Sequence, residues 1–345
     1  MDVIDVFSGC GGTSLGFRQA GFRIRAAIDL DRSALDSFTA NFPKASTYCR
    51  DIRLITNTDL TSVRERAGVG PFVLIGCAPC QPFSKVHTSH PDDDPRRTLL
   101  AEFSRAVRVL SPEAIFLENV PGIQRGSSET SQFSIFLQEI SALGYSYDYG
   151  VVKCTDYGVP QTRLRLVLVA AFGRPVSLLR RRHSRAKELT VRHWIGNLPP
   201  IECGQAHPTI DGHVASALSE TNLKRIRAVP AEGSRMSLPT DLMLKCHEKH
   251  RGHTDVYGRM RWDAPASAIT TRCISLSNGR FGHPSQDRAI SLREAARLQT
   301  FPDSFSIRGS VRSGARQIGN AVPPRMAKFI ARDLRRQLEE SGGDR

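Results

Sequence analysis

Long apolar runs and a dense set of cysteines are both missing from this sequence. No segment approaches the roughly 18 consecutive apolar residues that a membrane-spanning helix needs. The 8 cysteines are too sparse in 345 residues for a disulfide framework, which indicates a reducing compartment. No signal peptide precedes residues 3–7, which already have the pattern of a core strand. We therefore expect a cytoplasmic protein without membrane contact.

Positive charge is in excess, and it is confined to one half of the chain. The net charge is +14. Residues 1–170 hold 18 basic and 18 acidic side chains, whereas residues 171–345 hold 30 and 16. A neutral half joined to a strongly basic half predicts that the second half faces a polyanion. The alternative is a basic surface without a partner. No basic amphipathic helix stands out, which argues against a lipid surface.

The first 170 residues alternate between strand and helix patterns. Short apolar runs that end at turn signals are typical of buried strands, and apolar residues three and four positions apart are typical of helices. These patterns predict strands at residues 3–7, 24–28, 73–75, 114–117, 151–153 and 166–170, and helices at 12–20, 32–41, 99–110 and 132–143. The alternation predicts an α/β fold with a doubly wound, mainly parallel sheet.

The pattern changes near Gly173. A polar region without clean periodicity follows and runs to about residue 280. Helical signals then return at residues 291–300, where Ser291 and Glu294 have the spacing of a capping box, and again from Pro323-Pro324. We therefore expect a first domain over residues 1–173, a smaller inserted domain over 174–280, and a return to the first domain over 281–345.

A cysteine stands at the most informative turn. The apolar run 72–75 leads into a Gly/Pro-rich segment, and Cys80 lies between Pro79 and Pro82. A thiol at the end of a sheet strand, on backbone stiffened by proline, is placed for chemistry. A small buried thiol is the alternative, because free cysteines are commonly buried.

Glycines and acids follow the first three predicted strands. The segment 5–12 reads DVFSGCGG, so its glycines precede a helix N-terminus that favours a carboxylate or phosphate. Its spacing is not G-x-G-x-x-G, which argues against a dinucleotide. Asp29 ends the second predicted strand, and an acid in that position commonly binds ribose hydroxyls; Asp51 lies near where a further strand would end. The order suits a nucleoside with a carboxylate tail, such as S-adenosylmethionine.

Further polar residues follow two later strands. Glu118 follows the strand at 114–117, and a thiol together with an acid fits covalent catalysis on a ring. Arg163 and Arg165 share one face of an extended segment, where their fork-shaped donors could hold a carbonyl, a phosphate or the Glu118 carboxylate. A surface acid and an exposed basic strand are the alternatives.

Six segments, taken in order, resemble the motifs of the DNA (cytosine-5) methyltransferases of the compact bacterial or phage type. They read DVFSGCGG (5–12), GCAPCQPFS (76–84), ENV (118–120), QTRLRL (161–166), REAARLQTFPD (293–303) and QIGNAVPP (317–324). The resemblance covers nearly the whole chain apart from residues 174–270. It implies the S-adenosylmethionine-dependent methyltransferase fold, site-specific methylation of cytosine in duplex DNA, and an enzyme that is solitary or part of a restriction–modification system.

The resemblance also implies roles for individual residues. Cys80 would attack carbon 6 of a flipped-out cytosine, Glu118 would bind ring nitrogen 3 and the exocyclic amine, and Arg165 would contact the carbonyl. Carbon 5 would then take the methyl group of S-adenosylmethionine, and no metal is needed. The remaining residues assigned to the catalytic pocket are Asn119, Gln161 and Arg163.

Contacts to cofactor and DNA carry over in the same way. The methionine part of the cofactor would contact Phe7, Ser8, Gly9, Gly11, Gly12 and Asn320. Asp29 would bind the ribose, and Asp51 and Ile52 would contact the adenine. Pro79 and Leu99 would close the site. Leu30 departs from members that place an aromatic residue against the adenine. The expected DNA contacts are Gln81, Ser84, Arg96, Arg180, Arg181 and Arg182, with base reading in residues 174–270. The implied state is a monomer near the nucleoid, with a restriction endonuclease as a possible separate partner.

Several alternatives stay open on the sequence. A tRNA cytosine-5 methyltransferase would share the fold, but its Cys-Phe-Thr signature is missing; an inactive DNA-binding regulator would not need Cys80 or Glu118. Cys77 and Cys80 form a C-x-x-C pair without a second pair at zinc spacing. Cys246, His247, His250 and His253 could bind a metal, but surface histidines of a basic, DNA-facing region explain them better.

Overall fold

Two compact units make up the chain. The computed structural model describes residues 1–68, 70–78, 98–124, 131–181, 183, 185–248 and 252–340. Unit 1 comprises Met1–Lys153, Leu164–Arg181 and Val322–Arg345, and unit 2 comprises Cys154–Arg163 and Arg182–Ala321. The sequence analysis placed the return of the chain at residue 281, whereas the contacts group residues 281–321, and also the short segment Cys154–Arg163, with unit 2.

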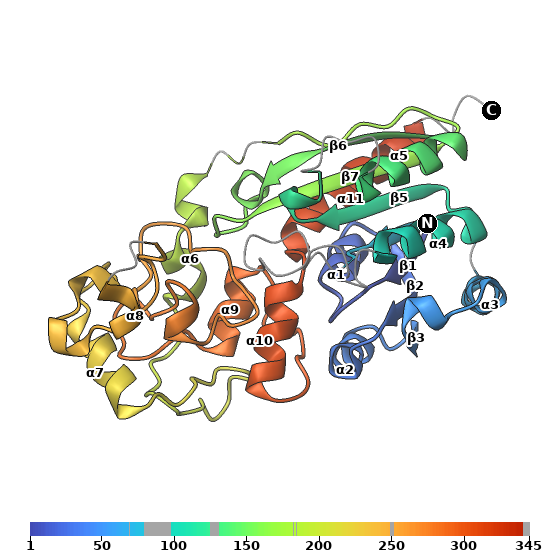
Figure 1. The fold of residues 1–345 in the computed structure, drawn as a ribbon. Coiled ribbons are helices and arrows are strands. Elements are labelled where there is room, and N and C mark those ends of the chain that lie inside the picture. Colours follow the sequence, from blue (N-terminus) through green and yellow to red (C-terminus); the bar gives the residue numbers. More distant parts are fainter. Residues whose placement is uncertain are drawn as a thin grey trace. The chain divides into compact units, whose positions relative to one another are not determined.

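Unit 1 is built on a seven-stranded sheet with the strand order β3-β2-β1-β4-β5-β7-β6 (Figure 1). All neighbouring strands run parallel except β7, which is antiparallel to both β5 and β6. The prediction of a doubly wound, mainly parallel sheet is confirmed. The strands are β1 (Asp2–Val6), β2 (Arg23–Asp29), β3 (Ser46–Cys49), β4 (Phe72–Gly76), β5 (Ala114–Asn119), β6 (Tyr145–Lys153) and β7 (Leu164–Phe172).

Helices cover both faces of this sheet. On one face, apolar side chains of three helices pack against alternate residues of the strands, among them Ile4, Leu74 and Leu117. These helices are α3 (Asn57–Ala67), α4 (Leu99–Leu110) and α5 (Gln132–Ala142). On the other face, Phe17 packs edge-on against Phe116, with ring centroids 5.4 Å apart. The remaining helices of unit 1 are α1 (Gly12–Gln19), α2 (Arg32–Asn41) and α11 (Pro324–Glu340).

Close packing of two helices brings the end of the chain against its beginning within unit 1. A methyl group on Gly16 of α1 would lie 2.5 Å from the Ala327 side chain and 2.6 Å from the carbonyl oxygen of Pro324. Only glycine leaves room for this approach. The helix predicted from Pro323-Pro324 is confirmed, and Pro324 is its first residue, where a missing N–H is harmless.

Unit 2 contains short helices and little regular sheet. Its helices are α6 (Val191–Ile195), α7 (Glu220–Ala228), α8 (Lys245–Glu248), α9 (Leu292–Leu298) and α10 (Val311–Asn320). A small core gathers Ile226, Val229, Leu238, Tyr257, Leu276 and Ala289. The capping box predicted at Ser291 and Glu294 is present at the start of α9.

In unit 2, the side chains of two arginines donate hydrogen bonds to backbone carbonyl groups of irregular segments. Arg259 donates to the carbonyl oxygens of Val229, Ile226, His283 and Gln286, and Arg280 donates to those of Glu232, Gly233 and Arg259. Because buried carbonyl groups need partners, these guanidinium groups hold the irregular segments together. Part of the positive charge counted in the sequence therefore stabilises the fold.

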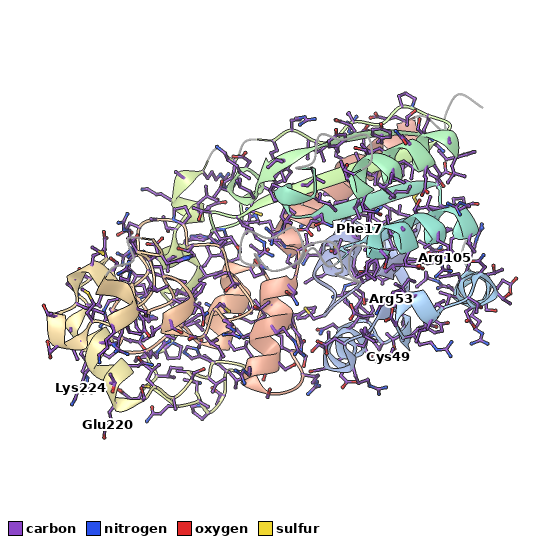
Figure 2. All side chains as sticks on the ribbon, in the orientation of Figure 1. Phe17, Cys49, Arg53, Arg105, Glu220 and Lys224 are labelled. Carbon is purple, nitrogen blue, oxygen red and sulfur yellow. The ribbon has the colours of Figure 1, made fainter. Side chains whose placement is uncertain are left out.

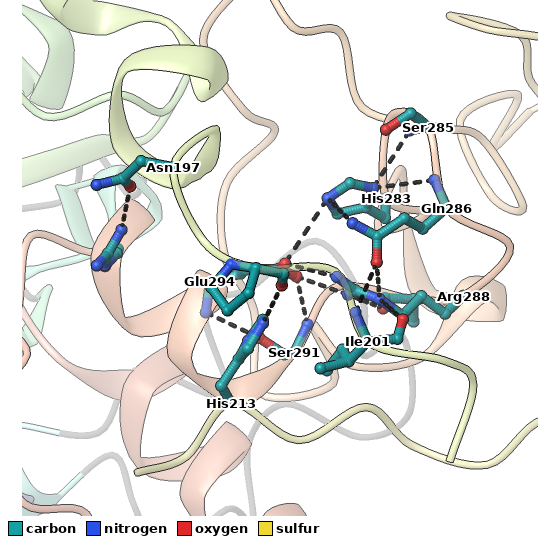
Figure 3. Close-up of polar contacts among 12 residues, drawn as sticks. Asn197, Ile201, His213, His283, Ser285, Gln286, Arg288, Ser291 and Glu294 are labelled. Atoms are coloured by element: carbon teal, nitrogen blue, oxygen red, sulfur yellow. Dashed lines mark hydrogen bonds and ion pairs between the residues drawn. The ribbon is translucent and has the colours of Figure 1, made fainter. Parts of the chain in front are cut away.

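A second internal network surrounds Glu294 (Figure 3). Both oxygens of this buried carboxylate accept from Arg288, at 2.7 and 2.8 Å, and one also accepts from the backbone N–H of Ser291. Ser291 Oγ lies 2.9 Å from Nδ1 of His213, which is itself buried. The Arg288 pair keeps the pKa of Glu294 below its usual value despite burial, which raises it. The start of α9 is thus fixed by the Arg288–Glu294 charge pair, by His213 at Ser291, and by His283, whose Nε2 lies 3.7 Å from Glu294.

None of the described helices is long and apolar enough to cross a membrane.

Candidate active site

The turn after β1 departs from ordinary backbone geometry. Phe7 has φ of 62°, an unusual value for a bulky residue, and Gly9 and Gly11 have φ of 53° and 94°. A methyl group on Gly11 would lie 2.6 Å from the Phe42 ring. Both this contact and the positive φ therefore exclude a side chain at Gly11. Strain of about 1–3 kcal/mol at such a residue as Phe7 persists only where the surroundings impose it, and it concentrates at functional sites.

Polar groups at this turn suit a bound ligand. Gly11 precedes α1 without a side-chain cap among the described residues, so N–H groups of the first turn are left for a ligand. Ser8 Oγ and Asp5 Oδ1 are buried and have no hydrogen-bond partner in the described part of the chain. The other Asp5 oxygen accepts from Ser14 Oγ at 2.6 Å, and burial raises the pKa of Asp5 to about 8. These orphaned atoms fit the polar, carboxylate-bearing end of S-adenosylmethionine.

The two acids predicted after β2 and β3 lie at the same end of the sheet as this turn. Asp29 accepts from the backbone N–H of Gly9 at 2.7 Å and from that of Asp31 at 2.8 Å, so it ties the turn to β2. Burial raises the pKa of Asp29, and the two backbone donors oppose that effect. Leu30, which follows Asp29, is 66% exposed.

Asp51 is already engaged by an arginine. Arg53, which is labelled in Figure 2, donates from Nε and Nη2 to the Asp51 carboxylate at 2.5–3.1 Å. This contact keeps the pKa of Asp51 below its usual value. The neighbouring Ile52 is buried, and its carbonyl oxygen accepts from Arg105 of α4 at 2.8 Å. Neither arginine was identified from the sequence, because their roles depend on contacts across the fold.

Glu118 and Arg165 form an ion pair at the carboxyl end of β5. The Nε of Arg165 lies 2.6 Å from Oε1 of Glu118, and the two side chains are 17% and 9% exposed. Asn119 follows Glu118, and its amide donates to the carbonyl oxygen of Ala78 at 3.2 Å. The structure therefore brings Glu118, Asn119 and Arg165 together beside the segment after β4.

Cys77, directly after β4, contacts the helix that follows the glycine-rich turn. Its Sγ lies 3.2 Å from Oγ1 of Thr13 in α1. Removal from water, followed by the charge of Glu118, raises the pKa of the Cys77 thiol well above its usual value. A protonated thiol is a poor nucleophile, so Cys77 is unsuited to covalent chemistry. Thr13 was not identified from the sequence, although it stands in the first turn of the predicted helix.

Gln161, Arg163 and Asn320 belong to unit 2. Gln161 is fully buried; its amide nitrogen lies 3.0 Å from the Leu298 carbonyl and 2.5 Å from Oε1 of Gln299, and its oxygen accepts from the N–H of Ile269. Arg163 donates to the carbonyl oxygens of Ile269 and Gly319. Asn320 ends α10 and is exposed. Gln161 and Arg163 thus hold the backbone of unit 2.

The other predicted site residues divide into two groups. Leu99 is the buried first residue of α4, Arg180 pairs with Asp148 at 3.0 Å, and Arg181 lies 3.8 Å from the centre of the Phe329 ring. The second group lies outside the described residues and comprises Pro79, Cys80, Gln81, Ser84, Arg96 and Arg182.

The structure describes only part of the group of residues considered for a metal site. No three His, Cys, Asp or Glu side chains gather at metal-binding distance in the residues that the structure describes. Cys246 is exposed, His253 has φ of 51°, and His250 and the side chain of His247 lie outside the description.

A sheet of this order, with a glycine-rich turn after β1 and acids after β2 and β3, defines the S-adenosylmethionine-dependent methyltransferase fold. The crystal structure of a DNA modification methyltransferase encoded within an Escherichia coli prophage matches with a TM-score of 0.74 at 24% identity, over 98% of this chain and 99% of that one. A methyltransferase from Entamoeba histolytica, EhMeth, matches with a TM-score of 0.65 at 16% identity, over 100% and 99%.

Comparison of sequences narrows the class. The model of the C-5 cytosine-specific DNA methylase family matches residues 1–336. The type II methylase M.HgiDII of Herpetosiphon aurantiacus is 40% identical over 98% of this chain and 96% of its own length. The type II methyltransferase M1.HphI of Haemophilus parahaemolyticus is 32% identical over 96% and 86%.

This chain belongs to the C-5 cytosine-specific DNA methylase family. It is a DNA (cytosine-5) methyltransferase that uses S-adenosylmethionine, as the resemblance of its six motifs predicted. The family assignment favours DNA over tRNA as substrate and an enzyme over an inactive regulator.

Proposed function

We propose that Cys80 is the nucleophile of this methyltransferase and that Glu118 and Arg165 hold the target cytosine. The observation that carries the proposal is the buried Glu118–Arg165 pair, whose neighbour Asn119 binds the carbonyl of Ala78, two residues before Cys80. A nucleophile, an acid and a fork-shaped cation are then provided by neighbouring elements of one unit.

The residues act on the cytosine ring in sequence. The Cys80 thiolate adds to carbon 6, and the ring electrons shift toward carbon 5 while Glu118 shares a proton with ring nitrogen 3 and accepts a hydrogen bond from the exocyclic amine. Arg165 supports the Glu118 carboxylate and the base carbonyl. S-adenosylmethionine, when bound, supplies the electrophilic methyl group for carbon 5. Loss of the carbon 5 proton and departure of the Cys80 thiolate restore the aromatic ring. The base must leave the duplex first, because neither carbon is accessible inside the stack.

The cofactor would bind along the ends of β1, β2 and β3. Asp29 and Asp51 are the acids for the ribose and the adenine, although each already holds partners that the ligand must share or displace. The turn residues Ser8, Gly9 and Gly11 supply open backbone and an orphaned hydroxyl. The further cofactor contacts in this proposal are Phe7, Gly12, Ile52, Pro79, Leu99 and Asn320.

Gln161 and Arg163 would support the pocket indirectly. Their polar atoms bond to unit 2 partners such as Ile269 and Gly319. Gln161 and Arg163 lie on either side of Thr162, in the segment that directly precedes β7. Arg165 belongs to β7. Gln161 and Arg163 would shape the pocket by fixing the backbone of the segment to which they belong.

DNA would be held by basic side chains and read by the inserted region. Residues 174–280 are proposed as the target-recognition domain, and the cluster Arg180–Arg182 as a phosphate contact, together with Gln81, Ser84 and Arg96. Within the cluster, Arg181 lies over the Phe329 ring and would support its neighbours rather than bind a phosphate itself. Grafting residues 174–270 into a family member of different specificity should transfer the new target. An active chimera that keeps the recipient's target would contradict the domain assignment.

The relatives suggest a biological setting. M.HgiDII and M1.HphI are named type II enzymes, so we propose that this protein protects DNA within a restriction–modification system. It would act as a monomer in the cytoplasm, close to the nucleoid, with an endonuclease that recognises the same site separately. Sequencing bisulfite-converted DNA from a host that expresses the protein would reveal the methylated sequence.

Substitution of the nucleophile tests the mechanism. Cys80→Ser should abolish transfer of tritiated methyl groups while leaving cofactor binding and the melting temperature nearly unchanged, because a hydroxyl is a far weaker nucleophile than a thiolate. A target duplex with 5-fluorocytosine should trap the wild-type protein covalently, since fluorine at carbon 5 is not lost as a proton is. Near-normal turnover by Cys80→Ser would overturn the mechanism.

A further inference from the structure

Two consecutive residues of the segment that leads to Cys80, namely Cys77 and Ala78, contact neighbouring elements. Cys77 contacts Thr13 of α1, with 3.2 Å between Sγ and Oγ1, and Ala78 accepts a hydrogen bond from Asn119 of β5. Cys77 and Ala78 directly follow β4, whose last residue Gly76 already packs against Phe103 so closely that a methyl group would lie 2.4 Å from that ring. The start of the segment therefore has two side-chain anchors, one on each neighbouring element.

Thr13 is placed by the same turn that suits the cofactor. It is buried and follows Gly11 and Gly12, and the next residue, Ser14, is bound to Asp5 at 2.6 Å. Upstream, Gly9 is held by Asp29 at 2.7 Å. A ligand bound at the turn therefore contacts a rigid helix start, and Thr13 belongs to that helix start.

Cys77 is suited to a positioning contact. Burial, reinforced by the charges of Glu118 and Asp5 and opposed by the Thr13 contact and Arg165, raises the pKa of the Cys77 thiol, so either Cys77 or Thr13 has a hydrogen to donate in their contact. It also lies only three residues before Cys80 in the chain. A contact between a cofactor-binding helix and this segment is in a position to transmit a shift of a few tenths of an ångström to the nucleophile.

We propose that Thr13 and Cys77 are positioning residues that align the Cys80 segment with the cofactor-binding turn. The proposal rests on Cys80 as the nucleophile. Neither residue touches the base; the pair fixes the chain from which Cys80 reaches it. Because misplacement of about 1 Å can lower a rate by about 100-fold, loss of the contact affects turnover more than ligand affinity.

Three variants separate positioning from simple stability. Thr13→Val and Cys77→Ala each remove the contact, and Cys77→Ser keeps a hydrogen-bonding group. Turnover is measured with tritiated S-adenosylmethionine on long unmethylated genomic DNA, and affinity for S-adenosylhomocysteine is measured by calorimetry without DNA. We expect kcat to fall about 10- to 100-fold in Thr13→Val and Cys77→Ala. S-adenosylhomocysteine affinity stays within about twofold, and Cys77→Ser retains most of the wild-type kcat.

A double variant tests whether the two residues act through one contact. Thr13→Val combined with Cys77→Ala should lose no more activity than either single change, since residues that share one interaction are not additive. Thr39→Val is the matched control: it removes an exposed hydroxyl 3.3 Å from Thr47 in the same unit and should leave both measurements unchanged.

The outcomes distinguish this inference from the proposed mechanism. Normal kcat in Cys77→Ala, a loss in Cys77→Ser as large as in Cys77→Ala, additive losses in the double variant, or a parallel loss of S-adenosylhomocysteine affinity would each overturn the positioning role. If any of those results came with an inactive Cys80→Ser, Cys80 would remain the nucleophile and only the positioning role of Thr13 and Cys77 would be rejected. An active Cys80→Ser would overturn both.

Discussion

Arg165 and Glu118 lie diagonally across two antiparallel strands and meet as an ion pair, with Nε 2.6 Å from Oε1. Glu118 pairs in register with Val167 of β7, so Arg165 lies two residues along the same face of the sheet. Both side chains are largely shielded from water, and removal of either leaves a buried charge without its partner. The sheet register thus decides where the proposed base-binding acid points.

Substitution of Glu118 should separate chemistry from folding. Glu118→Gln keeps the shape of the side chain but removes the charge that Arg165 holds, and it exchanges an acceptor for a donor. We expect kcat with tritiated cofactor to fall by about 10²- to 10⁴-fold, the usual range for loss of a group that handles protons. S-adenosylhomocysteine binding should remain near the wild-type value. A variant with wild-type kcat would exclude Glu118 from the reaction.

Packing of α1 against α11 should be sensitive to one methyl group. Gly16→Ala places a carbon 2.5 Å from the Ala327 side chain, so the helices must separate. We expect the free energy of unfolding to fall by about 1–3 kcal/mol, as for other overpacked contacts. Gly70→Ala is a matched control, because its new methyl group meets nothing within 4 Å. Equal stabilities of the two variants in urea denaturation would contradict the close packing.

His283 should make unit 2 sensitive to acid. Its Nδ1 accepts from the backbone N–H groups of Ser285 and Gln286, at 3.2 and 3.0 Å, so a proton there would face two donors. Burial, opposed by Glu294 and reinforced by Arg288, Arg259 and His213, lowers the pKa of His283 from 6.5 to about 4. The neutral form is favoured in the folded state, so its stabilising contribution is complete above pH 6.5 and is lost as the pH falls toward 4.

Asparagine offers a non-titrating replacement. The Asn side-chain oxygen also accepts from N–H groups two and three residues on, so His283→Asn should keep the turn while its melting temperature falls less between pH 6.5 and 4. His207→Asn is the control, because half-buried His207 makes the same contacts to Thr209 and Ile210. An unchanged pH dependence in His283→Asn would show that other groups cause the acid sensitivity.

Arg180 and Arg181 should differ in their contribution to DNA binding. Arg180 is 61% exposed in its pair with Asp148, and an exposed pair of this kind is weak enough to exchange for a phosphate. Arg180→Ala should therefore reduce the slope of log affinity against log salt by about 1. Arg181 lies over the Phe329 ring, so Arg181→Ala should lower the melting temperature and leave the slope unchanged. The opposite pattern, measured by fluorescence anisotropy with duplex DNA, would reverse these assignments.

Local patterns predicted the regular parts of the fold well. The helices expected at residues 32–41 and 99–110 have those bounds in the structure, since capping or strong amphipathicity marks their limits. The pattern missed β3, whose four residues are largely exposed, and α3, whose surface is mostly polar. It also shortened β6 and β7. The polar residues of β6, which lies at the edge of the sheet, break its apolar run, and β7 begins and ends with exposed or half-buried residues.

The sequence by itself determined the family, the fold class and the order of the six motifs, because these depend on residue type and spacing along the chain. Only the tertiary structure decided which charges are available. Arg163, Arg235, Arg259, Arg288 and Arg293 count as basic residues in the sequence, yet they are buried and donate to backbone carbonyls or to a carboxylate. Likewise, Thr13 and Cys77 are 64 residues apart and meet only through packing of α1 beside β4. Long-range hydrogen bonds of this kind depend on which elements become neighbours, and no local pattern records that choice.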